Sequence, residues 1–150
     1  MIEAAIDRSK ISLINMENKL KHLEFIQTTI NRMAGNLFFL RGWAITLITG
    51  LFAVSVAKET DDRYIALAFL LLLIFWILDG YFLAQERRFR DLYDDVRKVD
   101  ENNIDFSMKT KKYKNTRRNT WLGAIFSVTL LWFYVPLAAA MLAVLYLINK

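Results

Sequence analysis

The sequence predicts an all-α integral membrane protein with three transmembrane helices, and three observations support this fold class. Three long apolar runs stand out: Leu37–Ala57 carries one charge in 21 residues, Tyr64–Ala84 one in 21, and Trp121–Ile148 none in 28. A helix needs about 20 apolar residues to cross the hydrocarbon core of a bilayer. The remaining 80 residues are fewer than a separate domain of typical size contains. The polar flanks, moreover, show helical spacing of their apolar residues.

The charges outside the apolar runs predict the orientation in the membrane. Residues 1–36 hold five basic and four acidic residues, and residues 85–120 hold eleven basic and seven acidic residues. The short turn 58–63 is acidic, with two basic and three acidic residues. Because short basic segments stay in the cytoplasm, we expect a cytoplasmic N-terminus, spans over 37–57, 64–84 and 121–148, and an external C-terminus.

The third run is longer than a single span requires. As a helix its 28 residues would measure about 42 Å, against a hydrocarbon core of about 30 Å. Pro136 lies near its middle and should kink a helix there, because proline removes a backbone hydrogen bond. We therefore expect one tilted or kinked helix, whose first residues project into the cytoplasm. A re-entrant segment is the alternative.

The polar segment before the first span has a seven-residue apolar repeat. The repeat comprises Ile6, Leu13, Met16, Leu20, Leu23, Ile30 and Ala34, at alternating spacings of three and four residues that the polar residues Ser9 and Gln27 interrupt. Such a pattern is typical of a coiled-coil seam, which would join copies of the chain into a homo-oligomer. Two alternatives remain open: the helix packs against the second cytoplasmic segment, or it lies on the membrane surface.

The second span is expected to continue as a helical stalk over residues 85–99. An apolar stripe follows this segment at helical spacing: Phe89, Leu92, Tyr93, Val96 and Val99. Opposite charges four residues apart, as in Glu86–Arg90 and Arg87–Asp91, favour a helix. We expect the stripe to contact the N-terminal helix.

A basic cluster follows the stalk and is a candidate site for an anion. It contains six cations and one aromatic residue within residues 108–118: Lys109, Lys111, Lys112, Lys114, Arg117, Arg118 and Tyr113. The cluster is typical of a segment that binds anionic lipid headgroups, each cation contributing about 1 kcal/mol. The alternative is a receptor for a phosphate-bearing ligand, with an aromatic ring stacked on a base.

Two formal charges lie inside the predicted spans, Arg41 and Asp79. An ionisable residue at this depth is a candidate functional residue. Counted from the turn, the two lie at nearly the same depth, so we expect an ion pair near the cytoplasmic end. In an oligomer they could instead line a charged pore mouth. A line of small residues in the first span, which includes Thr46 and Thr49, is typical of close packing between helices, and the alternative is that it faces water in a pore.

Composition excludes several kinds of chemistry. The chain has no cysteine and a single histidine, His22, so thiolate chemistry, a histidine-rich metal site and a Ser-His-Asp triad are not expected. No P-loop or dinucleotide fingerprint occurs. The sequence therefore predicts neither an enzyme nor a bound cofactor or metal.

Residues 20–95 resemble a family of small bacterial membrane proteins. The similarity lies in the segments Leu23–Gln27, Ile30–Ala34, Leu40–Trp43, Phe75–Leu83 and Gln85–Tyr93. This family comprises the membrane effectors of Hailong-type anti-phage defence and, more distantly, the small effectors of bacterial nucleotide signalling. The resemblance implies an oligomeric ion channel in the bacterial inner membrane, which we expect to be a tetramer. It also implies control by an oligonucleotide, oligodeoxyadenylate in the Hailong case, made by a partner nucleotidyltransferase.

Two functions are compatible with these features. The first is a ligand-gated pore, which requires several copies because three spans cannot enclose a water path. The second is a non-conducting membrane anchor that recruits a cytoplasmic partner through its helical stalk. Ion conduction by the purified protein distinguishes the two.

Overall fold

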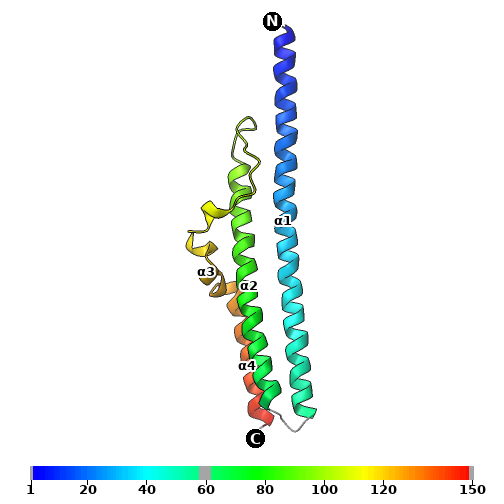
Figure 1. Cartoon of the computed structure of the whole chain (residues 1–150), viewed down its shortest axis with the longest axis vertical. Coiled ribbons are helices and arrows are strands. Elements are labelled where there is room, and N and C mark those ends of the chain that lie inside the picture. The colour runs from blue at the N-terminus through cyan, green and yellow to red at the C-terminus, as the bar shows by residue number, and fades with distance from the viewer. Residues whose placement is uncertain (1, 58–61, 149–150) are drawn as a thin grey trace.

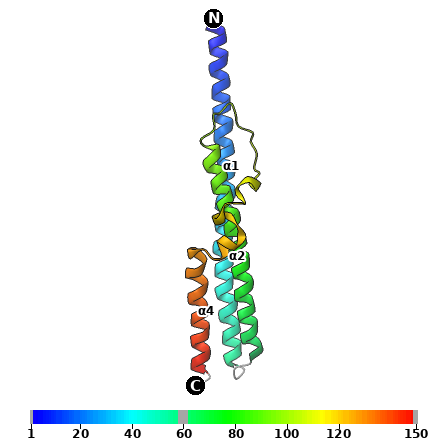
Figure 2. The ribbon, with the colours of Figure 1, turned by 90° about the vertical axis from the view of Figure 1, so that its left-hand side faces the viewer.

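The computed structural model describes residues 2–57 and 62–148. Two long antiparallel helices, α1 (Ile2–Ala57) and α2 (Asp62–Val96), pack side by side along most of the molecule (Figure 1). A third long helix, α4 (Val128–Ile148), runs beside the half of this hairpin in which α1 ends and α2 begins (Figure 2). The N-terminal part of α1 extends beyond all other elements (Figure 1).

Among the described residues, three helices are long and apolar enough to cross a membrane: Ile6–Ser55, Arg63–Val96 and Val128–Leu147. In the single chain only 17–22% of the residues in each apolar stretch are buried, and the others are exposed or half-buried. Apolar side chains in such numbers are stable on a surface that lipid or other protein covers. The structure thus agrees with an all-helical membrane protein of three spans.

Both predicted cytoplasmic segments continue from membrane helices without a break. The expected helix over 1–36 and the expected span over 37–57 form the single helix α1, which contains no proline. The second span likewise continues into the stalk, which ends at Val96 rather than Val99. Lys19 of α1 caps this end, because its ammonium group donates to the backbone oxygens of Arg97 and Val99, at 3.2 and 2.6 Å.

The expected single helix over 121–148 is divided into two. A short helix, α3 (Trp121–Ile125), is followed by a bend at 126–127 and then by α4. The bend resolves the excess length of this run, since the 21 residues of α4 measure about 31 Å and match the bilayer core. Pro136 lies inside α4, which continues on both sides of it, so the chain bends before the proline.

Close packing places α3 against α2 at the start of the membrane-facing half. A Cβ atom added at Gly80 would lie 2.4 Å from Cγ1 of Ile125, so only glycine fits at this position without a shift. The indole nitrogen of Trp76 donates to the backbone oxygen of Ile125 at 3.1 Å. These contacts connect α2 directly to the segment that leads into α4.

The buried side chains form two clusters, one along the spans and one in the stalk. The stalk cluster comprises Ile26 and Ile30 of α1 with Leu92 and Val96 of α2. This confirms the prediction that the stalk stripe contacts the N-terminal helix. The larger cluster lies between the three apolar helices and includes residues of α1, α2 and α4, among them Ile48, Leu72 and Tyr134.

Candidate functional site

The ion pair expected between Arg41 and Asp79 is formed. Nε of Arg41 lies 2.8 Å from Oδ2 of Asp79, and a second guanidinium nitrogen lies 3.4 Å from Oδ1. The Asp79 side chain is completely buried, whereas that of Arg41 is 27% exposed. A charge that is buried in an apolar region is costly without a partner, so this pair joins the first two spans.

Aromatic side chains from α2 and α4 surround the ion pair. The guanidinium group of Arg41 lies 5.6 Å from the ring centroid of Phe133, a cation–π contact. Tyr134 is fully buried near Asp79, and its ring stacks on Trp76 with centroids 5.6 Å apart. Sequence reasoning missed these residues, although Tyr134 stands out as a polar residue in the middle of the charge-free third run.

The small residues predicted to line the first span lie on its outward face. Thr46 and Thr49 are both exposed, and the Thr46 hydroxyl donates to the backbone oxygen of Gly42 at 3.0 Å. A Cβ atom at Gly42 or Gly50 would contact nothing within 4 Å. A groove of about 270 Å³ runs along this face, lined by Phe38, Phe39, Gly42, Trp43 and Thr46. In the single chain these small residues of α1 therefore face away from α2 and α4.

The predicted coiled-coil seam is divided between two environments. Ile30 is buried against the stalk, and Leu23 is half-buried there. Intramolecular packing therefore accounts for this part of the repeat. The other five seam residues are exposed: Ala34 and, farther toward the N-terminus of α1, Ile6 (63%), Leu13 (64%), Met16 (48%) and Leu20 (60%).

The exposed seam and the small-residue line lie on the same face of α1. Gly42 follows Ile6 by 36 residues and Thr49 follows Leu13 by 36, which is about ten turns of an α-helix. One continuous face thus follows α1. Its side chains are apolar in the N-terminal half of the helix, and they are small or hydroxylated in the half that forms the predicted span. In the single chain the side chains on both halves of this face are exposed.

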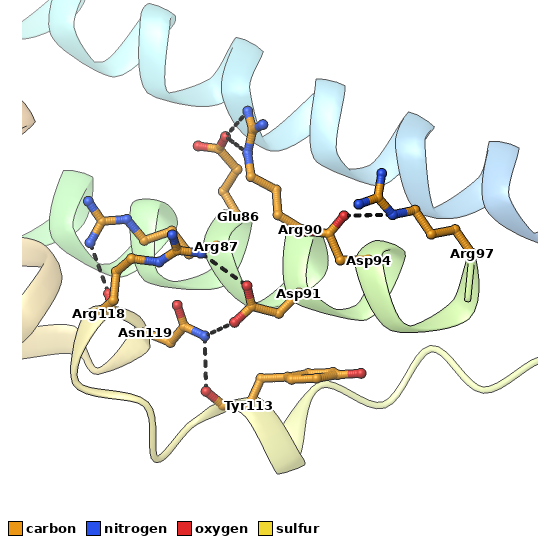
Figure 3. A network of polar contacts seen from close by, with 9 residues as sticks. All are labelled: Glu86, Arg87, Arg90, Asp91, Asp94, Arg97, Tyr113, Arg118 and Asn119. Carbon is orange, nitrogen blue, oxygen red and sulfur yellow. Dashed lines mark hydrogen bonds and ion pairs between the residues drawn. The ribbon is translucent and has the colours of Figure 1, made fainter. Parts of the chain in front are cut away.

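The basic cluster lies along the stalk, where two carboxylates of α2, Asp91 and Asp95, pair with part of it. Figure 3 shows the pairing of Asp91 with Arg118. Nζ of Lys112 and the Tyr113 hydroxyl both donate to Asp95, at 3.1 and 2.7 Å. A guanidinium nitrogen of Arg118 donates to Asp91 at 3.0 Å. Three of the seven predicted ligand residues, Lys112, Tyr113 and Arg118, therefore already bond to carboxylates of α2. We predicted that Asp91 pairs with Arg87, but Asp91 pairs with Arg118 instead. Arg87 donates to the backbone oxygen of Arg118.

Asn119 holds the end of the basic cluster on α2. Its side chain is fully buried, and its amide nitrogen donates to Asp91 and to the backbone oxygen of Tyr113 (Figure 3). The backbone oxygen of Asn119 in turn accepts two hydrogen bonds from the guanidinium group of Arg88, at 2.9 and 3.0 Å. Sequence reasoning missed Asn119 and Arg88, since nothing in their spacing indicates the contact.

The remaining cations face solvent and form the accessible part of the cluster. Lys109, Lys111, Lys114 and Arg117 are all exposed. Beside them is a cavity of about 460 Å³, which Lys109, Lys111 and Lys112 line together with Asp95 and Asp105. An anion could bind the lysines, at the cost of repulsion from the two carboxylates. Among the described residues no group of three or more His, Cys, Asp or Glu side chains could hold a metal ion.

The pairing of Asp95 predicts a pH dependence of the stalk contact. Hydrogen bonds from Tyr113 and then Lys112 hold the pKa of Asp95 below its ordinary value of 3.8. The contact is therefore fully present above pH 3.8 and is lost as the pH falls through the folded-state pKa. Because both charged partners are exposed, it contributes at most about 1 kcal/mol. We expect hydrogen exchange of residues 109–120 to be slower than in Asp95→Asn at neutral pH, and equal at low pH. A difference that persists below the folded-state pKa would contradict this assignment.

A buried polar group on α1 lacks a hydrogen-bond partner within the part of the chain that the structure describes. His22 is 5% exposed, and its Nε2 atom has no hydrogen bond. The ring of Phe106 meets the imidazole edge-on, with centroids 5.6 Å apart, and Phe106 itself has a φ angle of +51°. A buried unpaired polar atom costs about 1–3 kcal/mol, and left-handed backbone at a bulky residue costs a similar amount. The unpaired nitrogen of His22 and the strained backbone of Phe106 thus lie at the same contact.

No protein-family model, no curated protein and no solved structure matches this chain.

Proposed function

We propose that this chain forms an oligomeric transmembrane ion channel that acts as an effector of anti-phage defence under the control of a nucleotide signal. The observation that carries the proposal is the continuous outward face of α1. Neighbouring copies that meet along this face would cover its apolar cytoplasmic half. Its membrane half, with Gly42, Thr46 and Thr49, would allow close helix packing and present hydroxyl groups to a water path.

The conducting path in this proposal lies between subunits. The interior of one chain is filled by the side chains of the span cluster, and three helices are too few to surround a channel. A ring of four copies around α1 is the arrangement we propose. The Arg41–Asp79 pair would lie beside the inner mouth of this path and fix the position of α1 against α2.

The proposed orientation follows the basic residues. The projecting part of α1, the stalk and the basic cluster lie in the cytoplasm, the C-terminal end of α4 lies outside, and the membrane is the bacterial inner membrane. The acidic turn 58–63 would be external. Its residues 58–61 and the terminal Lys150 fall outside the described residues, so the proposal for the two external ends depends on charge alone.

The proposed ligand is an anionic oligonucleotide that binds the exposed cations of the basic cluster. A polyanion would compete with Asp91 and Asp95 for Arg118 and Lys112, and exposed ion pairs are weak enough, about 0–1 kcal/mol each, to be exchanged. Displacement of residues 109–119 would move α3, which rests on Gly80 and leads into α4. The resemblance to Hailong-type effectors supports oligodeoxyadenylate, made by a partner nucleotidyltransferase, as this ligand.

Ion flux through proteoliposomes tests the proposal. We expect the purified protein to pass K⁺, and we expect oligodeoxyadenylate to change the flux at least tenfold. In the triple variant Lys109→Gln/Lys111→Gln/Lys114→Gln the ligand effect should be lost while flux without ligand persists. Lys10→Gln, an exposed lysine on the projecting part of α1, is the matched control and should respond normally. Vesicles that stay impermeable with and without ligand would contradict a channel and favour the membrane anchor that recruits a partner.

A further inference from the structure

We propose that the groove between α1 and residues 106–108 binds a flat heteroaromatic ring, and that the Phe106 side chain occupies the ring position when this ligand is absent. The groove has a volume of about 620 Å³. One face of α1 forms its floor, and the segment that follows α2 crosses over it. The lining residues are Asn18, Lys21, His22, Phe25, Thr29, Phe106 and Met108.

The unpaired imidazole nitrogen defines what the ligand must offer. Nε2 of His22 is buried and has no hydrogen-bond partner, although a neutral imidazole nitrogen either donates or accepts one. The Phe106 ring makes a T-shaped contact with the imidazole and offers it no polar atom. A ligand whose ring carries its own N–H group or acceptor would satisfy Nε2, which a purely hydrocarbon ring leaves unpaired.

The two phenylalanine rings indicate that this ligand is flat. Phe25 is 68% exposed at the edge of the groove, and Phe106 is 49% exposed although it touches His22. Exposed aromatic faces of this kind stack on planar rings. An aromatic ligand could therefore replace the Phe106 ring beside the imidazole and stack on Phe25.

The backbone at Phe106 favours such an exchange. Its φ of +51° is a conformation that a bulky side chain rarely adopts, so the contact with His22 is made at the expense of strain. An incoming ring that takes the position beside His22 would free residue 106 to leave this conformation. The segment over 104–108 would then separate from α1. This inference does not depend on channel activity, because the groove is formed within one subunit.

Nuclear magnetic resonance of the imidazole nitrogens tests the proposal directly, since His22 is the single histidine of the chain. The full-length protein in nanodiscs, labelled with ¹⁵N-histidine, would be titrated with indole and with inosine as flat heteroaromatic probes. We expect a saturable shift of the Nε2 resonance with at least one of them. Cyclohexanol, which carries a hydroxyl group but no flat aromatic ring, should produce none. Absence of a saturable shift with both probes, or an equal shift with cyclohexanol, would overturn the proposal.

Two variants separate a binding role from a structural one. His22→Leu removes the unpaired nitrogen, so we expect it to raise the melting temperature and to weaken probe binding, followed by probe fluorescence or calorimetry, at least tenfold. Phe106→Gly removes the competing ring and tolerates a positive φ, so it should strengthen binding at least threefold. Leu70→Ala, at an exposed apolar residue on the membrane part of α2, is the matched control and should change neither. Weaker binding in Phe106→Gly, or unchanged binding in a folded His22→Leu, would contradict the proposal.

Discussion

Asp79→Ala is expected to destabilise the protein more than any other single substitution of a charged residue. It leaves the Arg41 guanidinium, 2.8 Å from the lost carboxylate, without its ion-pair partner in an apolar region. Removal of one partner of a buried pair costs about 3–5 kcal/mol, and the lower end applies because Arg41 is 27% exposed. We expect a fall of this size in the free energy of unfolding in detergent micelles, together with a loss of assembly.

A charge exchange separates a structural role of this pair from a role in conduction. The double variant Arg41→Asp/Asp79→Arg restores opposite charges at the two positions, so it should fold better than either single variant. If the pair serves only to join α1 to α2, ion flux recovers along with folding. If Arg41 also shapes the inner mouth of a pore, ion selectivity changes while folding recovers. Wild-type stability together with wild-type ion flux and selectivity in Arg41→Ala and Asp79→Ala would contradict both roles.

Gly42→Leu is expected to abolish assembly while the single chain keeps its fold. Nothing lies within 4 Å of a Cβ atom at this position, so one subunit accommodates the larger side chain, and leucine favours a helix more than glycine does. In the proposed oligomer the same side chain would separate helices that approach each other closely. We expect at least a tenfold loss of ion flux and a shift to single subunits in nanodiscs.

The matched control for this prediction is Ala66→Leu. Ala66 is a small exposed residue on α2 and lies outside the proposed α1 interface. This variant should assemble and conduct like the wild type. Equal losses in Gly42→Leu and Ala66→Leu would show that any added bulk on the membrane surface disturbs the protein, and would contradict a specific α1 interface.

The contacts that could be predicted from the sequence are those that the hairpin imposes. The short connection between the first two spans fixes their relative register, so Arg41 and Asp79 fall at one depth and meet. The same register brings the stalk stripe to α1, where Leu92 and Val96 contact Ile26 and Ile30. Helical spacing and chain reversal suffice for these predictions.

The contacts that could not be predicted depend on irregular chain. Residues 97–120 contain neither proline nor glycine to indicate a turn, so nothing in the sequence shows that Asn119 returns to Asp91. The bend at 126–127 likewise has no sequence signal and lies ten residues before the proline that suggested a kink. The face that α4 presents to Arg41 follows from this bend, and Phe133 and Tyr134 were missed for that reason.

The absence of cysteine from the chain makes one measurement especially direct. In Thr49→Cys the single thiol of the protein would lie on the outward face of α1, and in Leu70→Cys on the exposed surface of α2. A charged, water-soluble thiol reagent reacts with thiolates that water reaches and not with thiols in lipid. If copies of α1 surround a water path, Thr49→Cys in liposomes reacts rapidly and its ion flux is blocked, whereas Leu70→Cys stays unmodified. A cysteine at position 49 that is as unreactive as the one at position 70 would contradict the proposed channel.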